Sequence, residues 1–160
     1  MAKKQTKQLQ TLWWDWLSTA ERLLLSLHEQ TAALTLRKVE RLEEIQPEID
    51  GLLTRMTEID NQAVASARGL AEEYGVEPDL RSLVGALEKA EAQEVQAIAN
   101  RVIVVGRNVQ EVIDRNRTLI ENELQYVNGT LAVVGRIAIE QQGPYAGNAK
   151  AHNLVLDNVA

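Results

Sequence analysis

The stretch LQTLWWDWLSTAERLLLSLHEQTAAL, residues 9–34, decides the fold of this chain. Its apolar residues recur every seven positions in two interleaved series, one of Leu9, Trp16 and Leu23 and the other of Trp13, Ala20, Leu27 and Leu34. Residues at this alternating spacing of three and four lie on one face of an α-helix. The stretch therefore predicts a long amphipathic helix, which we expect to extend from about Gln5 to Leu36.

The next segment repeats this pattern and predicts a second long helix, from Val39 to Glu73. Its two series are Leu42, Ile49, Met56, Ala63 and Leu70, joined by Ile45, Leu52 and Ile59. Pro47 falls within this segment. Because proline removes a backbone donor and clashes with the preceding turn, Pro47 marks either a kink or the first turn of the helix, and we favour the kink.

A loop and a third helix follow. Residues 74–79, YGVEPD, combine a C-cap glycine, a proline and a capping aspartate, so we expect the chain to reverse there. Apolar periodicity resumes at Leu80 and continues to Glu140, which predicts one very long helix. Near Asn116 the apolar series shifts by four residues, as it does at a coiled-coil stutter. If this helix is broken, we expect the break at Gly106, Asn116 or Gly129.

Together these segments predict an all-α protein, an antiparallel bundle of long, coiled-coil-like helices. We expect the bundle to form one domain of residues 1–142. The glycines and the proline of residues 141–148, QQGPYAGN, end the helical pattern. Residues 143–160 are therefore expected to form a non-helical C-terminal tail.

Composition and motifs exclude most catalytic chemistry. The 160 residues include no cysteine, which rules out disulfides, thiolate metal sites and thiol nucleophiles. The two histidines, His28 and His152, do not form the Glu-x-x-His pairs of a di-iron bundle, so we expect no metal. No phosphate-binding loop or nucleophile motif is present. We therefore expect no enzymatic activity and no cofactor.

The charge balance and the apolar runs bear on partners and location. Seventeen Lys and Arg against 23 Asp and Glu give a net charge of −6, the wrong sign for binding nucleic acid or anionic lipid by counterion release. No apolar run approaches the roughly 20 residues that span a bilayer, so we expect no membrane insertion. The basic start of the chain is not followed by a signal-peptide core. A cytoplasmic protein is the expectation.

The three tryptophans have different expected roles. Trp13 and Trp16 belong to the apolar series of the first helix, which places them in the core. Trp14 does not belong to either series. Because tryptophan is enriched at interface hot spots, we expect Trp14 to contact a partner or a second copy of the chain.

Three parts of the chain resemble the FlgN-like flagellar type III export chaperones. Residues 114–127, DRNRTLIENELQYV, are similar to the family's last long helix, in which an Asn is followed by a Leu-Ile pair and then by Leu and Val. Residues 23–34, which include Glu29, resemble its leucine-rich first helix, and Gly75-Val76 followed by Leu83 resembles its mid-chain turn. Residues 143–147, GPYAG, are similar to the Tyr and Gly that follow the final helix.

The resemblance implies a cytoplasmic chaperone without catalytic activity. Its clients would be the hook-associated proteins, which form the hook–filament junction, and it would deliver them to the flagellar type III export gate. The implied client-binding residues are Asn116, Leu119, Ile120, Leu124, Val127 and Leu131, and the implied gate contact is Tyr145. A client helix with an apolar face would be masked by such a stripe through contacts at i, i+3, i+4 and i+7.

Alternatives remain open at three points. A buried Asn116 would equally well fix helix register without touching a client. Tyr145 would equally well fold back and cover the end of the last helix. The same heptads would also serve a structural coiled-coil homo-oligomer or scaffold without a client. What distinguishes that scaffold from a chaperone is whether the C-terminal stripe is already buried by the protein's own helices or by an identical chain.

Overall fold

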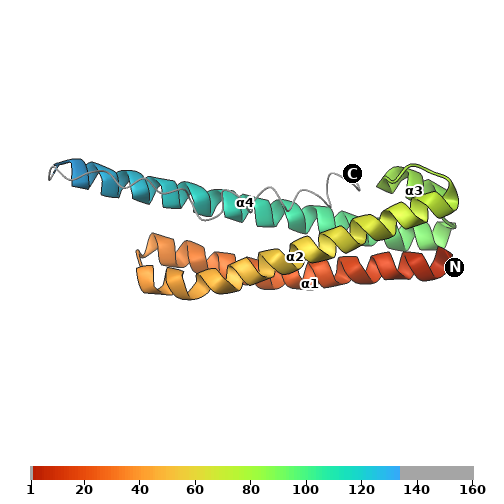
Figure 1. Cartoon of the computed structure of the whole chain (residues 1–160), viewed down its shortest axis with the longest axis horizontal. Coiled ribbons are helices and arrows are strands. Elements are labelled where there is room, and N and C mark those ends of the chain that lie inside the picture. The colour runs from red at the N-terminus through yellow and green to blue at the C-terminus, as the bar shows by residue number, and fades with distance from the viewer. Residues whose placement is uncertain (1, 134–160) are drawn as a thin grey trace.

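The structure is a computed structural model that describes the backbone of residues 2–133 and the side chains of residues 6–122 and Gln125. This part of the chain consists of four helices and contains no strand (Figure 1). The helices are α1 (Ala2–Thr35), α2 (Val39–Tyr74), α3 (Leu80–Ala86) and α4 (Lys89–Val133). The prediction of an all-α fold built from long helices is confirmed. The boundary at residue 142 and the predicted tail lie outside the described residues.

The three long helices run up, down and up, with α1 in the middle. α1 and α2 form an antiparallel hairpin, and α4 returns alongside α1 in the same direction as α1 (Figure 1). The short α3 lies at the end of the bundle where the chain starts. α1 packs against both α2 and α4, whereas in the described residues no α-carbon of α2 lies within 8 Å of one of α4. The core therefore follows α1 through the molecule.

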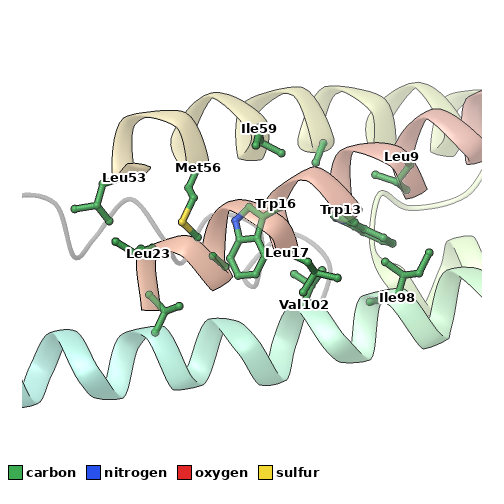
Figure 2. Packing of buried hydrophobic residues seen from close by; sticks show 14 of the residues in the cluster. Leu9, Trp13, Trp16, Leu17, Leu23, Leu53, Met56, Ile59, Ile98 and Val102 are labelled. Atoms are coloured by element: carbon green, nitrogen blue, oxygen red, sulfur yellow. The ribbon is translucent and has the colours of Figure 1, made fainter. Parts of the chain in front are cut away.

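The apolar series of the first helix forms this core as predicted. Figure 2 shows Trp13, Trp16 and Leu17 of α1 between residues of α2 and of α4. The seam residues at most 1% exposed are Leu9, Trp13, Trp16, Ala20, Leu23 and Leu27, and Leu34 near the end of α1 is half-buried. Facing them are Met56 and Ile59 of α2 and Ile98 and Val102 of α4 (Figure 2). Burial of these side chains is the main force that holds the helices together.

The end of α2 has the predicted glycine cap. Gly75 adopts a left-handed conformation with φ of 66°, and its N–H donates to the carbonyl of Glu72. The N–H of Val76 donates to Ala71 at 2.9 Å, which completes a Schellman motif. Pro47 lies within α2, well past the helix start at Val39, so the first-turn alternative for this proline is wrong.

The prediction of one helix from Leu80 to Glu140 is wrong, because the chain leaves the helix between α3 and α4. Leu87 is extended, with φ of −88° and ψ of 157°. The physical reason is tertiary packing: α3 covers the end of the hairpin with Leu80 and Leu83, both buried, and the chain must then turn to lie along α1. One straight helix would not both cover the end of the hairpin and lie along α1.

The N-cap of α3, which precedes this break, was predicted from the sequence. The Asp79 carboxylate accepts hydrogen bonds from the Ser82 N–H at 2.8 Å and from the Ser82 hydroxyl at 2.9 Å. These bonds stabilise the ionised form and lower the pKa of Asp79. By contrast, Gly106, Asn116 and Gly129, the expected break points, all lie inside the continuous helix α4.

Candidate functional site

Asn116 lies at the centre of a buried hydrogen-bond cluster that joins α4 to α1. Its Nδ2 donates to the carbonyl of Leu27 at 3.0 Å and to the Gln30 side chain at 2.8 Å. Its Oδ1 accepts a hydrogen bond from the Thr31 hydroxyl at 2.6 Å. Asn116 and Gln30 are both buried. A shift of α4 by one turn would break all three bonds, so the cluster fixes the register of α4 on α1.

This geometry gives Asn116 a structural role, which is to fix the register of α4 on α1. Its amide is fully buried and bonded on both sides, so it offers nothing to a client in this arrangement. The next residues of the stripe differ from it. Leu119 and Ile120 are half-buried, and Ile120 packs against the core.

Beyond these residues α4 leaves the bundle. Asn116 is level with Leu27 to Thr31, and α1 ends at Thr35. α4 continues from Asn116 to Val133, about 25 Å of further helix at a rise of 1.5 Å per residue. Figure 1 shows the blue end of α4 extending past the turn between α1 and α2. We call residues 120–133 of α4 the projecting segment.

The rest of the predicted stripe belongs to the projecting segment. Leu124, Val127 and Leu131 lie on α4 at a spacing that continues the helix face of Ile113 and Asn116. α1 and α2 do not extend alongside this part of α4 (Figure 1). The side chains of these three residues and all of Tyr145 lie outside what the structure describes.

The turn between α1 and α2 exposes apolar side chains at the same end of the bundle. Leu36 is 62% exposed and Val39 is 63% exposed. Between them Arg37 has a positive φ of 55°, which is uncommon for a residue with a side chain. Exposed apolar residues this close together are typical of a contact surface. Sequence reasoning missed them, and their only signal is that both fall outside the apolar series.

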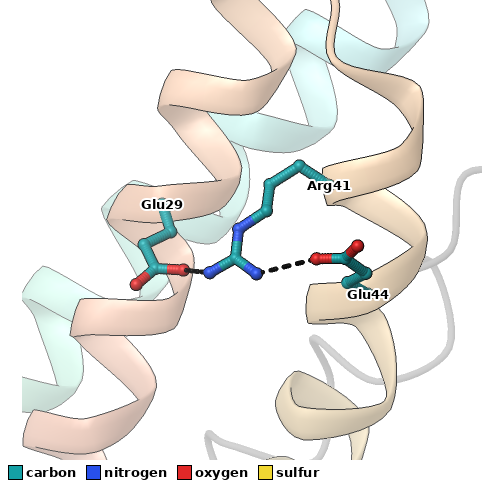
Figure 3. A network of polar contacts seen from close by, with 3 residues as sticks. All are labelled: Glu29, Arg41 and Glu44. Carbon is teal, nitrogen blue, oxygen red and sulfur yellow. Dashed lines mark hydrogen bonds and ion pairs between the residues drawn. The ribbon is translucent and has the colours of Figure 1, made fainter.

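A polar cluster bridges α1 and α2 beside this turn. The Arg41 guanidinium donates to Glu44 at 3.0 Å through Nη1 and to Glu29 through Nη2 (Figure 3). The hydrogen bonds to Glu44 and Glu29 raise the pKa of Arg41. All three side chains are about half exposed, so water screens the attraction and the cluster adds little stability. Glu29, the acid embedded in the leucine-rich stretch, thus has an intramolecular partner.

Trp14 also has an intramolecular partner. It is 46% exposed, and the guanidinium carbon of Arg101 on α4 lies 5.1 Å from the centroid of its ring. This is a cation–π contact between α1 and α4. The prediction that Trp14 contacts a partner or a second copy stays a prediction.

The core contains one ionisable side chain that the sequence reasoning missed. Asp60 of α2 is fully buried, and neither oxygen of its carboxylate has a hydrogen-bond partner. Burial raises the pKa of Asp60 to about 7, and the nearby Trp16 indole opposes this by a smaller amount without completing a hydrogen bond. Asp60 directly follows Ile59 of the apolar series. This position next to the core face is the only sequence feature that indicates its burial.

The described part of the chain contains neither a metal-binding cluster nor a membrane-spanning helix. Within 2–133, no three His, Asp or Glu side chains lie together in a way that would hold a metal ion. None of the helices in this part combines the length and apolarity that crossing a membrane requires.

Comparison with known proteins agrees with the resemblance seen in the residues. A model of the family described as FlgN protein matches residues 1–153. Comparisons with curated proteins and with solved structures gave no match. The family match covers the leucine-rich first helix, the mid-chain turn and the last helix. The chain therefore belongs to the FlgN family of flagellar export chaperones.

Proposed function

We propose that this protein is a cytoplasmic chaperone, without catalytic activity, for hook-associated proteins. It binds the C-terminal helix of its client with the projecting segment of α4 and delivers the client to the flagellar type III export gate. The observation that supports this proposal is the course of α4. The helix continues past the α1–α2 turn with apolar residues at core spacing, where no other described helix lies alongside it.

The proposed binding mode is one amphipathic helix packing on another. Ile120 packs against the core at the point where α4 leaves α1, so a client helix would continue the apolar seam that α1 begins. Leu124, Val127 and Leu131 would then contact apolar client residues at i, i+3, i+4 and i+7. The client's apolar face would be shielded from water and from premature assembly.

A substitution of Leu124 by Asp tests this assignment. A charge placed in a desolvated apolar contact should weaken binding of the hook-associated protein by roughly 100-fold. Gln125→Asp is the matched control. Gln125 is exposed, and the substitution adds the same negative charge one residue away from Leu124. Isothermal titration calorimetry measures the affinities, and circular dichroism checks that both variants stay helical.

The outcome distinguishes the chaperone from a structural oligomer. If Leu124→Asp binds the client as tightly as Gln125→Asp does, the projecting segment is not the client site. If Leu124→Asp converts a client-free oligomer into monomers, and no hook-associated protein binds the wild type, the protein is a coiled-coil scaffold.

The proposed gate contact is Tyr145, on the residues that follow the family's final helix. The sequence GPYAG combines a proline with two glycines, which permit a tight bend that presents the ring. Tyr145→Ala should leave stability and client binding unchanged and weaken gate binding. A lower melting temperature with unaltered gate binding would instead assign the ring to covering the end of α4.

A further inference from the structure

Three polar side chains follow one another along one face of α4. Gln110 donates from Nε2 to Oδ1 of Asp114 at 2.9 Å. Nη1 of Arg117 lies 3.7 Å from the same oxygen, which is an ion pair but too long for a hydrogen bond. Asp114 thus contacts the Arg117 guanidinium only at Nη1.

The other edge of this guanidinium is unpaired. Nε and Nη2 of Arg117 are both buried, and neither has a hydrogen-bond partner. These two nitrogens direct one N–H each to the same side of the planar group. That pair of donors matches the two oxygens of a carboxylate, which is the bidentate geometry that arginine forms best.

An unpaired donor pair of this kind is unfavourable in the free chain. Buried N–H groups lose their bonds to water, and a buried charge without a partner is more costly still. The Arg117 side chain as a whole keeps 30% of its surface exposed, so its buried edge lies next to the protein surface, and a partner carboxylate has to displace the atoms that cover Nε and Nη2 in order to bind them. Among the described residues no carboxylate reaches Nε or Nη2. A carboxylate from elsewhere would satisfy both donors at once.

The position of Arg117 indicates which carboxylate this is. The residue follows Asn116, where α4 is fixed on α1, and precedes the projecting segment by less than one turn. A helix docked on the projecting segment would therefore extend beside the Arg117 guanidinium. The chain has a net charge of −6, so acidic partner residues are otherwise repelled and would be accepted where a free cation faces them.

We propose that Arg117 is the anchor for a carboxylate of the client, an Asp or Glu beside the apolar face of its docked helix. The carboxylate binds Nε and Nη2 together and fixes the position of the client along α4. This inference rests on the proposed function and adds the chemistry that the client must have. It also gives the chaperone a means of selecting among apolar helices, because a helix without the acid leaves the buried donors unpaired.

The test uses the full chain and a peptide of the C-terminal segment of a hook-associated protein from the same organism. Affinity is measured for wild type, Arg117→Gln and Arg117→Lys. Arg115→Gln is the matched control, because Arg115 is an exposed neighbour and its loss changes the net charge equally. Arg117→Gln should weaken binding of the peptide roughly 10- to 100-fold. Arg117→Lys should weaken it almost as much, because an ammonium group cannot bind a carboxylate bidentately. Arg115→Gln should change the affinity by no more than about twofold.

Peptides in which each acid is replaced singly by its amide identify the partner. One replacement should weaken binding to wild type and have no further effect in Arg117→Gln, which is the coupling expected of a direct pair. The free chain should melt at nearly the same temperature with Arg117→Gln as with Arg115→Gln, because Nε and Nη2 have no partner to lose and the partly exposed ion pair of Nη1 with Asp114 adds little stability.

Each other outcome overturns the anchor. Equal affinities of Arg117→Gln and Arg115→Gln, or the lack of any coupled peptide acid, would exclude a direct pair. A clearly lower melting temperature of Arg117→Gln than of Arg115→Gln without peptide would show that the Arg117 guanidinium already has a stabilising partner within the free chain. If no such peptide binds wild type, the proposed function fails and the anchor fails with it, whereas tight binding that ignores Arg117 overturns the anchor alone.

Discussion

Two buried polar side chains, Asn116 and Asp60, have opposite effects on the stability of the bundle. The Asn116 amide is bonded to three groups of α1, so its burial is compensated. The Asp60 carboxyl has no partner, so its burial favours the protonated form. The first residue therefore holds α4 in place, and the second limits the stability of the α1–α2 hairpin near neutral pH.

Replacing Asp60 by Asn should stabilise the protein at neutral pH. The pKa of Asp60 rises from an ordinary 3.8 to about 7 on folding, so the folded state holds its proton over a range in which the unfolded state has lost it. Because of Asp60, the free energy of unfolding of the wild type thus falls as pH rises from about 4 to about 7, and this loss is constant above pH 7. Asp60→Asn should gain roughly 1–3 kcal/mol at pH 7.5 and almost nothing at pH 4.

Urea unfolding at both pH values measures this difference. Glu72→Gln is the control, since Glu72 is an exposed acid of the same helix and its loss should change stability little at either pH. An Asp60→Asn gain of the same size at pH 4 and pH 7.5 would contradict the assigned pKa.

Replacing Asn116 by Ala should destabilise the bundle. The change leaves the Gln30 side chain and the Leu27 carbonyl without their shared donor, which costs about 1–3 kcal/mol. The exposed Asn108 on the same helix is the matched control, and Asn108→Ala should melt like wild type. If Asn116→Ala melts like wild type and yet binds the client more weakly, the residue contacts the client and its register role is wrong.

The glycine that caps α2 and a glycine inside α2 should respond in opposite ways to the same substitution. Gly75 caps the helix with φ of 66°, where an L side chain is strained, so Gly75→Ala should cost about 1–2 kcal/mol. Gly51 lies in the helix interior with no atom within 4 Å of an added Cβ, so Gly51→Ala should gain about 0.5–1 kcal/mol. Thermal unfolding of the two variants checks this, and the same sign for both would contradict the assigned end of α2.

The helices themselves were predictable, and their interruption was not. Leu9, Trp16 and Leu23 mark a buried face by spacing alone, and α1 and α2 match the predicted ranges to within three residues. The break at Leu87 leaves only a weak trace in the sequence, because the large apolar residues stop at Leu87 and resume at Val95, and the alanine- and glutamate-rich residues between them are good helix formers. Packing of α3 on the end of the hairpin decides that break, and this depends on residues far away in the sequence.

The location of the candidate site stays a prediction, and its chemistry was not predictable from the sequence. The apolar residues after Asn116 identified the last helix as the binding element, and the course of α4 supports that choice. Whether Asn116 faces a client or another helix depends on the partners of its amide, which only the packed structure contains. The same is true of Arg117, whose charge is evident from the sequence but whose unpaired edge is not.

The described part of the protein is a helical hairpin of α1 and α2 that packs against α4 along about the first two-thirds of that helix. The seam from Val95 to Ile113 is buried against α1, the Asn116 cluster ends this packed part, and the projecting segment lies beyond it. Among the described helices, the apolar stripe thus lies on a helix that has a neighbour alongside only its first two-thirds. Client binding would complete the seam.

Hydrogen–deuterium exchange of the full chain, with and without the C-terminal segment of a hook-associated protein, tests this central claim most directly. In the free chain, amides of residues 120–133 should exchange much faster than those of residues 95–113, because beyond Ile120 no other described helix lies alongside α4. Addition of the client segment should slow exchange in residues 120–133 and leave α1 and α2 unchanged. Unchanged exchange in residues 120–133 at saturating client segment, or protection confined to α1 and α2, would contradict the account.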